Sequence, residues 1–174
     1  ALQFIDSEIA EHRKEAAKVF SQYAKTKDVI STDFYQQNFE KLLNDNNAEV
    51  AENCLHFIYH IDKAEELFKS PLFNMILNSR AIFSNTHIIY SLNKKPFDKN
   101  YITEYKAIVY KYIELQNKNI QNNEASYEIG KLFDIILKVY EYMEDNEILD
   151  LIDEFLKVPI YTYHNIFKEF ERTL

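Results

Sequence analysis

Apolar residues recur at steps of three and four along almost the whole chain, which is the spacing of one face of an amphipathic helix. The clearest example is the segment 101–113, and a second continuous face runs through residues 50–61. No segment alternates apolar and polar residues over a length that predicts a strand. The pattern predicts an all-α chain whose two best-defined inner faces consist of Val50, Ala51, Cys54, Leu55, Ile58 and Ile61, and of Tyr101, Tyr105, Ile108, Val109, Tyr112 and Ile113.

The same spacing assigns residues near the helix ends to inner faces. A stripe over residues 5–23 includes Ile9 and Tyr23, and the next stripe begins at Phe34 or Tyr35. Two stripes in the C-terminal half follow the same rule. They cover residues 129–143, ending with Tyr140 and Met143, and residues 148–156, beginning with Ile148 and Leu149.

Polar residues mark the expected helix boundaries. Thr32 or Asp33 can cap one helix, and the polar run 44–47 ends that helix and caps the next. Asp62 with Glu65 has the spacing of a capping box. Pro71 suits the first position of a following helix, because the N–H group that proline lacks is not needed there.

The helices are expected to alternate in length. Long ones begin near Glu8, Ala48, Arg80 and Glu124, and shorter, strongly apolar ones follow each. The shorter helices begin near Asp33, Leu67 or Pro71, Tyr101 and Glu147. Pairs of a long and a short helix are therefore expected to recur about every 40 residues, as in two-helix repeats. Residues 1–174 are thus expected to form a single all-α domain of about eight or nine helices, stacked as antiparallel pairs in a short curved solenoid. A single compact helical bundle is the alternative.

Two neighbouring segments carry a family resemblance. Asn47-Ala48-Glu49-Val50-Ala51-Glu52-Asn53-Cys54-Leu55-His56-Phe57-Ile58 resembles the third helix of an armadillo repeat. Phe68-Lys69-Ser70-Pro71-Leu72-Phe73-Asn74-Met75-Ile76-Leu77 is similar to the start of the next repeat, and residues 125–156 repeat this order more faintly. The glycine that usually separates the helices of an armadillo repeat is absent from both closer matches, so a HEAT-like pair and a plain bundle stay open.

The composition of the chain argues against several classes of site and partner. The single glycine, Gly130, cannot form a glycine-rich phosphate loop, and one cysteine forms neither an internal disulfide nor a cysteine-rich zinc site. A net charge of −8 argues against nucleic acid and anionic lipid as partners. No stretch of about 18 apolar residues predicts a membrane span. The chain begins at Ala1 without a visible signal peptide, so we expect a cytoplasmic, intracellular protein, either processed or a piece of a longer one.

Few residues suggest catalysis or metal binding. His56 and His60 lie one helical turn apart and Glu52 one turn earlier, so the three could bind a divalent metal. The preferred interpretation is that these histidines are solvated or half-buried beside the apolar face. Cys54 is expected to be a buried structural thiol, because His56, two residues away, lies on another side of the helix. With no Gly-x-Ser-x-Gly motif either, we expect no enzyme activity and no cofactor.

The strongest candidates concern binding. Residues 141–154 contain seven acidic residues and no lysine or arginine, a distribution that suits a basic partner, although a solvated helix end is the plainer interpretation. Partly exposed tyrosines are typical of interfaces, although most are expected at the margins of the core. The predicted partner-binding residues are Tyr110, Glu144, Asp145, Glu147, Asp150, Tyr161 and Tyr163.

These observations predict a non-catalytic scaffold or adaptor that binds a protein or peptide on a helical-repeat surface. The partner is expected to be basic or amphipathic, because the surface is acidic and rich in aromatic residues. The alternative is a helical bundle that encloses a small apolar ligand or a metal.

Overall fold

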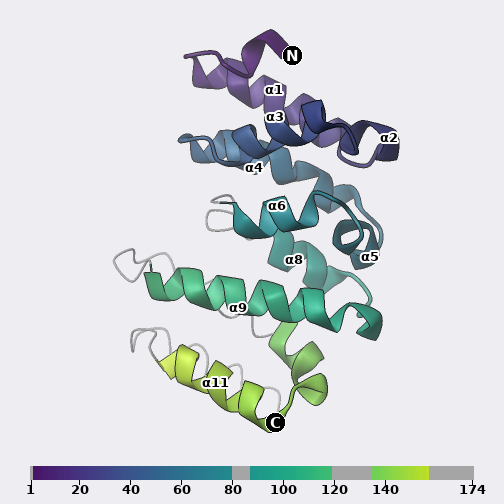
Figure 1. The fold of residues 1–174 in the computed structure, drawn as a ribbon, viewed down its shortest axis with the longest axis vertical. Coiled ribbons are helices and arrows are strands. Elements are labelled where there is room, and N and C mark those ends of the chain that lie inside the picture. Colours follow the sequence, from purple (N-terminus) through teal and green to yellow (C-terminus); the bar gives the residue numbers. More distant parts are fainter. Residues whose placement is uncertain (1, 80–86, 119–134, 157–174) are drawn as a thin grey trace. The chain divides into compact units, whose positions relative to one another are not determined.

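The computed structural model describes residues 2–79, 87–118 and 135–156, and every regular element in these ranges is a helix (Figure 1). The all-α prediction is confirmed, and the number of helices is close to the expected eight or nine. Residues 135–139 are helical as well. The elements are η1 (Leu2–Phe4), α1 (Ala10–Tyr23), α2 (Lys27–Ile30), α3 (Asp33–Leu43), α4 (Ala48–Leu55), η2 (His56–His60), α5 (Ala64–Phe68), α6 (Phe73–Asn78), α8 (His87–Lys94), η3 (Lys99–Tyr101), α9 (Ile102–Lys118), η4 (Tyr140–Tyr142) and α11 (Asp145–Leu156).

A short helix precedes a longer one four times along the described chain. The pairs are α2 with α3, α5 with α6, η3 with α9, and η4 with α11. Their short members begin at residues 27, 64, 99 and 140, a step on the order of 40 residues that agrees with a helical repeat. The expected alternation of lengths holds for α1 and α3, with 14 and 11 residues, but it is wrong further on, because α4 has only 8 residues before η2 whereas α9 has 17. The starts expected near Arg80 and Glu124 for the other long helices lie outside the described residues. The armadillo or HEAT type of such a repeat stays a prediction.

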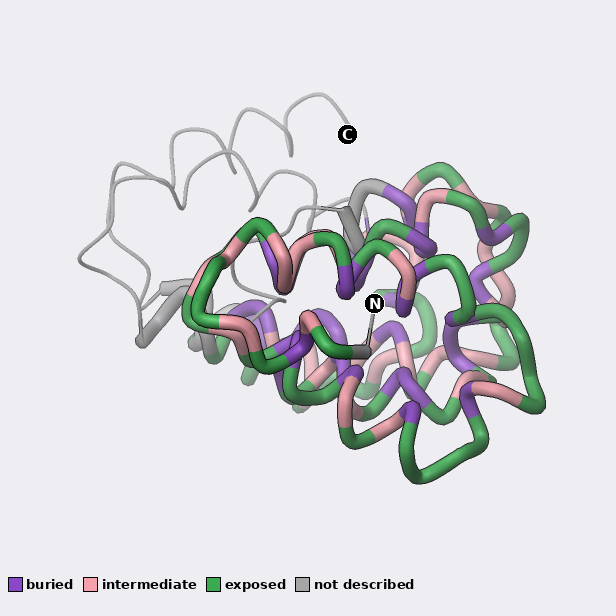
Figure 2. The backbone as a smooth tube through the Cα atoms, turned by 90° about the horizontal axis from the view of Figure 1, so that it is seen from above, coloured by how far each residue is buried: buried purple, intermediate pink, exposed green. Residues whose placement is uncertain are grey.

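Burial follows the helical period, with buried positions recurring along the helices between exposed ones (Figure 2). The predicted inner face of residues 50–61 is buried, as is that of residues 105–113, whereas Tyr101 is half-buried. Ile9 and Tyr23 are more than half exposed, contrary to prediction. Ile9 precedes the first turn of α1, and the inner face at the other end of this helix is taken by residues 20, 21 and 24. Tyr35 is buried and Phe34 exposed.

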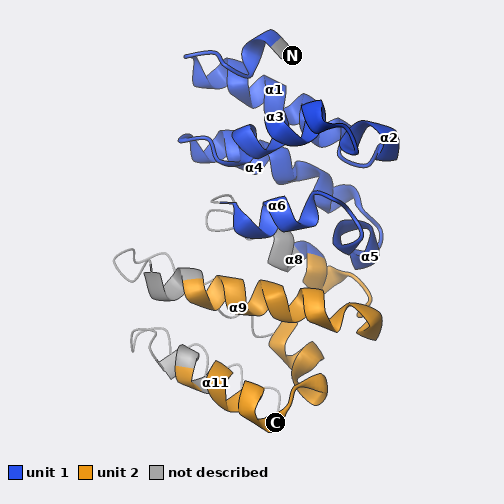
Figure 3. Ribbon diagram, in the orientation of Figure 1, with its two compact units in different colours: residues 1–91 blue, residues 92–174 orange. Residues whose placement is uncertain are grey.

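The chain divides into two compact units, residues 1–91 and 92–174, which are described separately (Figure 3). The single domain expected for residues 1–174 stays a prediction. In the first unit α1 packs against both α3 and α4. A short connection, residues 44–47, joins α3 to α4, so these contacting helices form an antiparallel pair.

Buried polar contacts fix how the helices of the first unit meet. The Tyr35 hydroxyl donates to the Phe20 carbonyl oxygen at 2.6 Å, which joins α3 to α1. The backbone N–H of Phe57 donates to Ser21 Oγ at 2.8 Å, which joins η2 to α1. Both contacts are buried, where an unpaired polar group would destabilise the fold.

Helix capping agrees with the sequence in two places and differs in two. Thr32, one of the two predicted candidates, caps α3, and Asn47, the last residue of the predicted run 44–47, caps α4. The carboxylate that caps α5 belongs to Glu66 and not to Glu65, because Glu66 Oε1 accepts from the backbone N–H groups of residues 62 and 63 at 2.9 and 3.0 Å. Pro71 lies in a turn before α6, which begins two residues later than the proline position predicts.

A bidentate ion pair joins α1 to the connection between α3 and α4. Arg13 Nε and Nη2 donate to the two carboxylate oxygens of Asp45 at 2.6 and 3.0 Å, and the Asn47 N–H donates to the same carboxylate at 2.8 Å. Burial alone would raise the pKa of Asp45, but the hydrogen bonds from Arg13 and Asn47 outweigh it and hold the pKa below its usual value.

In the second unit α9 packs against α11. The ring of Phe97 lies 5.1 Å from that of Tyr105 and 5.9 Å from that of Tyr142, measured between centroids. Lys138 Nζ donates to the Asn93 carbonyl oxygen at 3.1 Å. These contacts join η4 and the residues just before it to the segments that flank η3.

Replacing Ser21 with alanine should destabilise the first unit, because it leaves the buried N–H of Phe57 without its acceptor. We expect a loss of about 1–3 kcal/mol in the free energy of unfolding, measured by urea denaturation. Ser31→Ala is the matched control, since the Ser31 hydroxyl bonds to the Lys27 carbonyl at an exposed site, and it should cost less than about 0.5 kcal/mol. Equal unfolding midpoints for the two variants would contradict the role of Ser21.

The Arg13–Asp45 pair predicts a pH dependence of stability. Because the pKa of Asp45 is lower in the folded chain, its carboxylate stabilises the fold above the unfolded value of about 3.9, and this contribution disappears as the pH falls through the folded value. The difference in free energy of unfolding between the parent and Asp45→Asn should therefore be largest near neutral pH and shrink below about pH 4. Urea denaturation across this range measures it, and a difference that stays constant with pH would show that the charge of Asp45 does not matter.

Candidate interaction surfaces

The predicted acidic surface lies at the start of α11 and just before it. Glu144, Asp145 and Asp150 are exposed there, and no lysine or arginine occurs between residues 139 and 156. Acidic side chains in the first turn of a helix interact favourably with its dipole, which accounts for Asp145 and Glu147 at this end of α11. The helix dipole does not account for Asp150, in the second turn, or for the absence of any compensating cation along the segment.

Glu147 is already engaged within the second unit. Its Oε2 accepts from Lys106 Nζ of α9 at 2.6 Å and from the backbone N–H of Glu144 at 2.9 Å, so the carboxylate caps α11 and joins it to α9. The hydrogen bond from Lys106 and then that from the Glu144 N–H lower the pKa of Glu147. Glu147 therefore serves the fold, and any acidic binding surface here depends on the exposed carboxylates around it.

Tyr110 belongs to the same contact. Its hydroxyl lies 3.5 Å from the Glu147 carbonyl oxygen, and its side chain is half-buried. Burial raises the pKa of Tyr110, and the nearby carboxylates of Glu147 and Asp150 raise it further. The structure thus brings the predicted residues Tyr110 and Glu147 together inside the second unit. Tyr161 and Tyr163, also predicted, lie outside the described residues.

Three large apolar side chains are exposed beside the acidic residues. Tyr140 and Tyr142 on η4 are 47% and 43% exposed, and Leu149 on α11 is 62% exposed. Tyr140 and Leu149 were predicted to face inward, but at this end of each stripe the inner positions are taken by Val139 and Leu151. The sequence contained a signal for this exposure. Each of the three has an acidic residue as a direct neighbour, and a charged side chain at that position has to reach solvent.

Cys54 is not available for chemistry. It is completely buried in α4, and this burial raises the pKa of its thiol. Since the thiolate is the reactive form, a buried thiol with a raised pKa is inert. The prediction of a structural cysteine is confirmed.

The proposed metal ligands lie near one another without forming a recognised site. His56 and His60 lie on the 3-10 helix η2, beyond the end of α4, and their ring centroids are 5.3 Å apart. Glu52 lines the same hollow as both histidines. Within the described ranges, no group of three or more histidine, cysteine, aspartate or glutamate side chains has the arrangement needed for a metal ion. The metal alternative therefore gains no support from the geometry.

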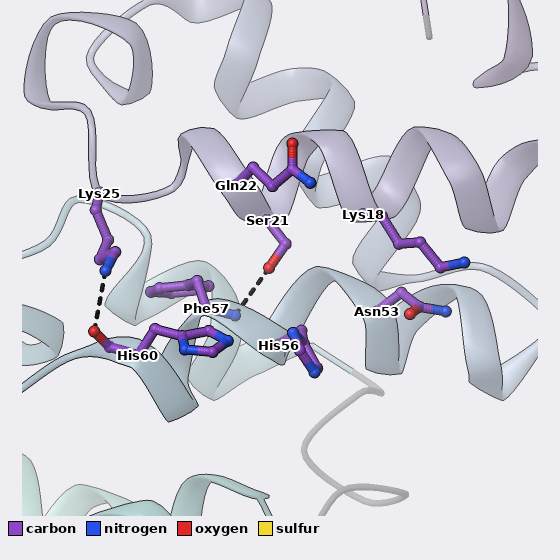
Figure 4. A pocket seen from close by; sticks show the side chains of 8 residues that line it. All are labelled: Lys18, Ser21, Gln22, Lys25, Asn53, His56, Phe57 and His60. Carbon is purple, nitrogen blue, oxygen red and sulfur yellow. Dashed lines mark hydrogen bonds between the residues drawn. The ribbon is translucent and has the colours of Figure 1, made fainter.

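A second surface of interest lies in the first unit, between α1 and the α4–η2 segment (Figure 4). A half-open hollow of about 510 Å³ there is lined by lysine, histidine and amide side chains around Ser21 and Phe57. None of its described lining residues is acidic, although the chain has a net charge of −8. No spacing rule could have found it, because its lining comes from two segments that lie far apart in sequence. The basic and amide residues are Lys18, Gln22, Lys25, Asn53, His56 and His60.

Comparison with known proteins adds no relative: no family model, no curated protein and no solved structure matches the chain. Of the described helices, none is both long enough and apolar enough to cross a membrane. Assignment of these surfaces therefore depends on their own geometry and charge.

Breaking the Lys106–Glu147 pair should loosen α11 from α9. Glu147→Gln removes the charge that Lys106 contacts, and we expect a lower urea midpoint for the second unit and a weaker dependence of that midpoint on salt. Glu141→Gln is the matched control, because Glu141 is exposed and its carboxylate contacts the hydroxyl of the neighbouring Tyr140. Equal midpoints for the two variants would show that the pair between the helices adds nothing.

Proposed function

We propose that the chain is a non-catalytic scaffold that binds a basic, amphipathic segment of another protein at the acidic surface around α11. One observation carries the proposal: Tyr140, Tyr142 and Leu149 are exposed within a segment that has acidic side chains and no cationic ones. Contiguous exposed apolar side chains are typical of interaction sites, and these three fall within ten residues of sequence.

The two kinds of side chain have complementary roles in such binding. The carboxylates of Glu144, Asp145 and Asp150 attract a basic partner and orient it, and they act mainly on the rate of association. Tyrosine and leucine side chains supply contact area that water leaves on binding, which favours affinity. An amphipathic helix with lysines on one side and leucines on the other would match both.

Several features of the described residues support a role without catalysis. Clear pKa shifts occur in the ion-paired groups Arg13, Asp45 and Glu147, and in the buried groups Tyr35, Cys54 and Tyr105. Active sites, by contrast, place groups with shifted pKa values together in an open cleft. The recurring short and long helices also suit a helical-repeat scaffold.

We also place this function in the cytoplasm, with no role in binding nucleic acid. The free, buried Cys54 is compatible with a reducing compartment, where cysteines stay unpaired. The net charge of −8 would repel a phosphate backbone over most of the surface.

The test neutralises the exposed acids and leaves Glu147 unchanged, because Glu147 supports the fold. The triple variant Glu144→Gln, Asp145→Asn, Asp150→Asn should weaken binding of a synthetic leucine–lysine amphipathic helix by about tenfold and flatten its salt dependence. Leu149→Ser should also weaken binding, without the change in salt dependence. Fluorescence anisotropy with labelled peptide, measured over a range of salt concentrations, gives both quantities.

The matched control removes three exposed acids from the first unit: Glu8→Gln, Asp28→Asn and Glu40→Gln. It changes the net charge by the same amount and should leave binding almost unchanged. If both triple variants weaken binding equally, the attraction comes from net charge alone and the proposed site is wrong. Affinity that does not depend on salt in the parent protein would also exclude it.

A further inference from the structure

The hollow in the first unit has a chemistry opposite to that of the acidic surface. Lys18 and Lys25 approach it from α1 and the residues just after it, and His56 and His60 approach it from η2 (Figure 4). Its volume of about 510 Å³ lies within the range of ligand-binding clefts. The two lysines are the charged side chains of this lining at neutral pH, and they would attract an anionic occupant.

Lys25 and Lys18 differ in how they are held. Lys25 Nζ donates to the His60 carbonyl oxygen at 2.9 Å, and no salt bridge joins it to a carboxylate of the described residues. That contact places the ammonium group at the edge of the hollow with two further donors available. Lys18 is half exposed and pairs with Glu15 of the same helix, an exposed ion pair that a ligand can replace at little cost.

The amide side chains that line the hollow indicate which groups its ligand carries besides the negative charges. Asn53 uses its NH₂ group on the Glu49 carbonyl, which leaves its carbonyl oxygen as an acceptor, and the exposed amide of Gln22 offers a donor and an acceptor. Paired donors and acceptors of this kind match the main chain of an extended peptide. Phe57, at the base of the hollow, is fixed by its N–H bond to Ser21.

We propose that this hollow binds an acidic, extended segment of another protein, whose carboxylate or phosphate groups contact Lys18 and Lys25. Carboxylates lie around part of the hollow: Glu15 pairs with Lys18, and Glu49 and Glu52 line an adjoining hollow that shares Asn53 and both histidines. No carboxylate of the described residues forms a salt bridge with Lys25, so the anionic groups of the peptide are drawn toward the end formed by Lys25 and His60. The site is separate from the acidic surface and does not depend on the function proposed for that surface.

The experiment measures binding of a fluorescein-labelled, glutamate-rich peptide by anisotropy. The Lys18→Glu, Lys25→Glu variant should weaken binding by at least about tenfold, and Lys18→Gln, Lys25→Gln by less. The control reverses two exposed lysines outside the hollow, Lys27→Glu and Lys41→Glu, and should leave affinity near that of the parent. Circular dichroism shows that each variant keeps its helices.

A second peptide, with phosphoserine in place of glutamate, distinguishes the two sources of negative charge. Binding of either peptide that is lost in the Lys18/Lys25 variants and kept in the control supports the site, and the tighter peptide identifies the preferred group. Absence of binding by both peptides, or equal loss in the control, would overturn the proposal. So would displacement of the peptide by inorganic phosphate alone at comparable concentration. The triple variant at Glu144, Asp145 and Asp150 should bind these peptides normally, which separates this test from that of the acidic surface.

Discussion

The packing of α1 against α4 is the contact on which the rest of the first unit depends. The residues buried on the two helices are mostly small: Ala16 and Ala17 on α1, and Val50, Ala51 and Cys54 on α4. Small side chains let two helices approach closely, and interiors packed at this density tolerate little change in volume. The small size of Cys54 therefore suits this close packing. Its presence at this buried position is explained without a reactive role for its thiol.

This close approach explains the geometry that follows α4. After Leu55 the chain continues as the 3-10 helix η2, and the Phe57 N–H bonds to Ser21 on α1. A serine buried on the inner face of α1 is thus satisfied by a backbone group from the neighbouring element. His56 and His60 on this 3-10 helix are exposed, and both border the basic hollow. The hydrogen bond between the Phe57 N–H and Ser21 thereby connects the buried core of the first unit to the polar surface beside it.

Periodicity was sufficient for features that depend on neighbours in sequence. It identified the buried face of residues 50–61, and cap chemistry located the start of α3 at Thr32 or Asp33 and the start of α4 within the run 44–47. Periodicity failed where the residue that a side chain contacts lies far away in the sequence. Glu147 looked like a surface charge, but its partner Lys106 is 41 residues away. The basic hollow also combines residues from positions 18 and 60, and no local pattern connects them.

Net charge was a poor guide to partners for a related reason. A value of −8 is a sum over the whole chain, whereas binding responds to charges within about one Debye length, roughly 8–10 Å in physiological salt. Around α11 the acids outnumber the lysine that contacts them, Lys106, and the hollow beside α1 has no acidic residue in its described lining, although Glu15 pairs with Lys18 at its edge. A basic partner and an acidic partner are therefore compatible with one acidic protein, because each would respond to the local charge and only weakly to the total.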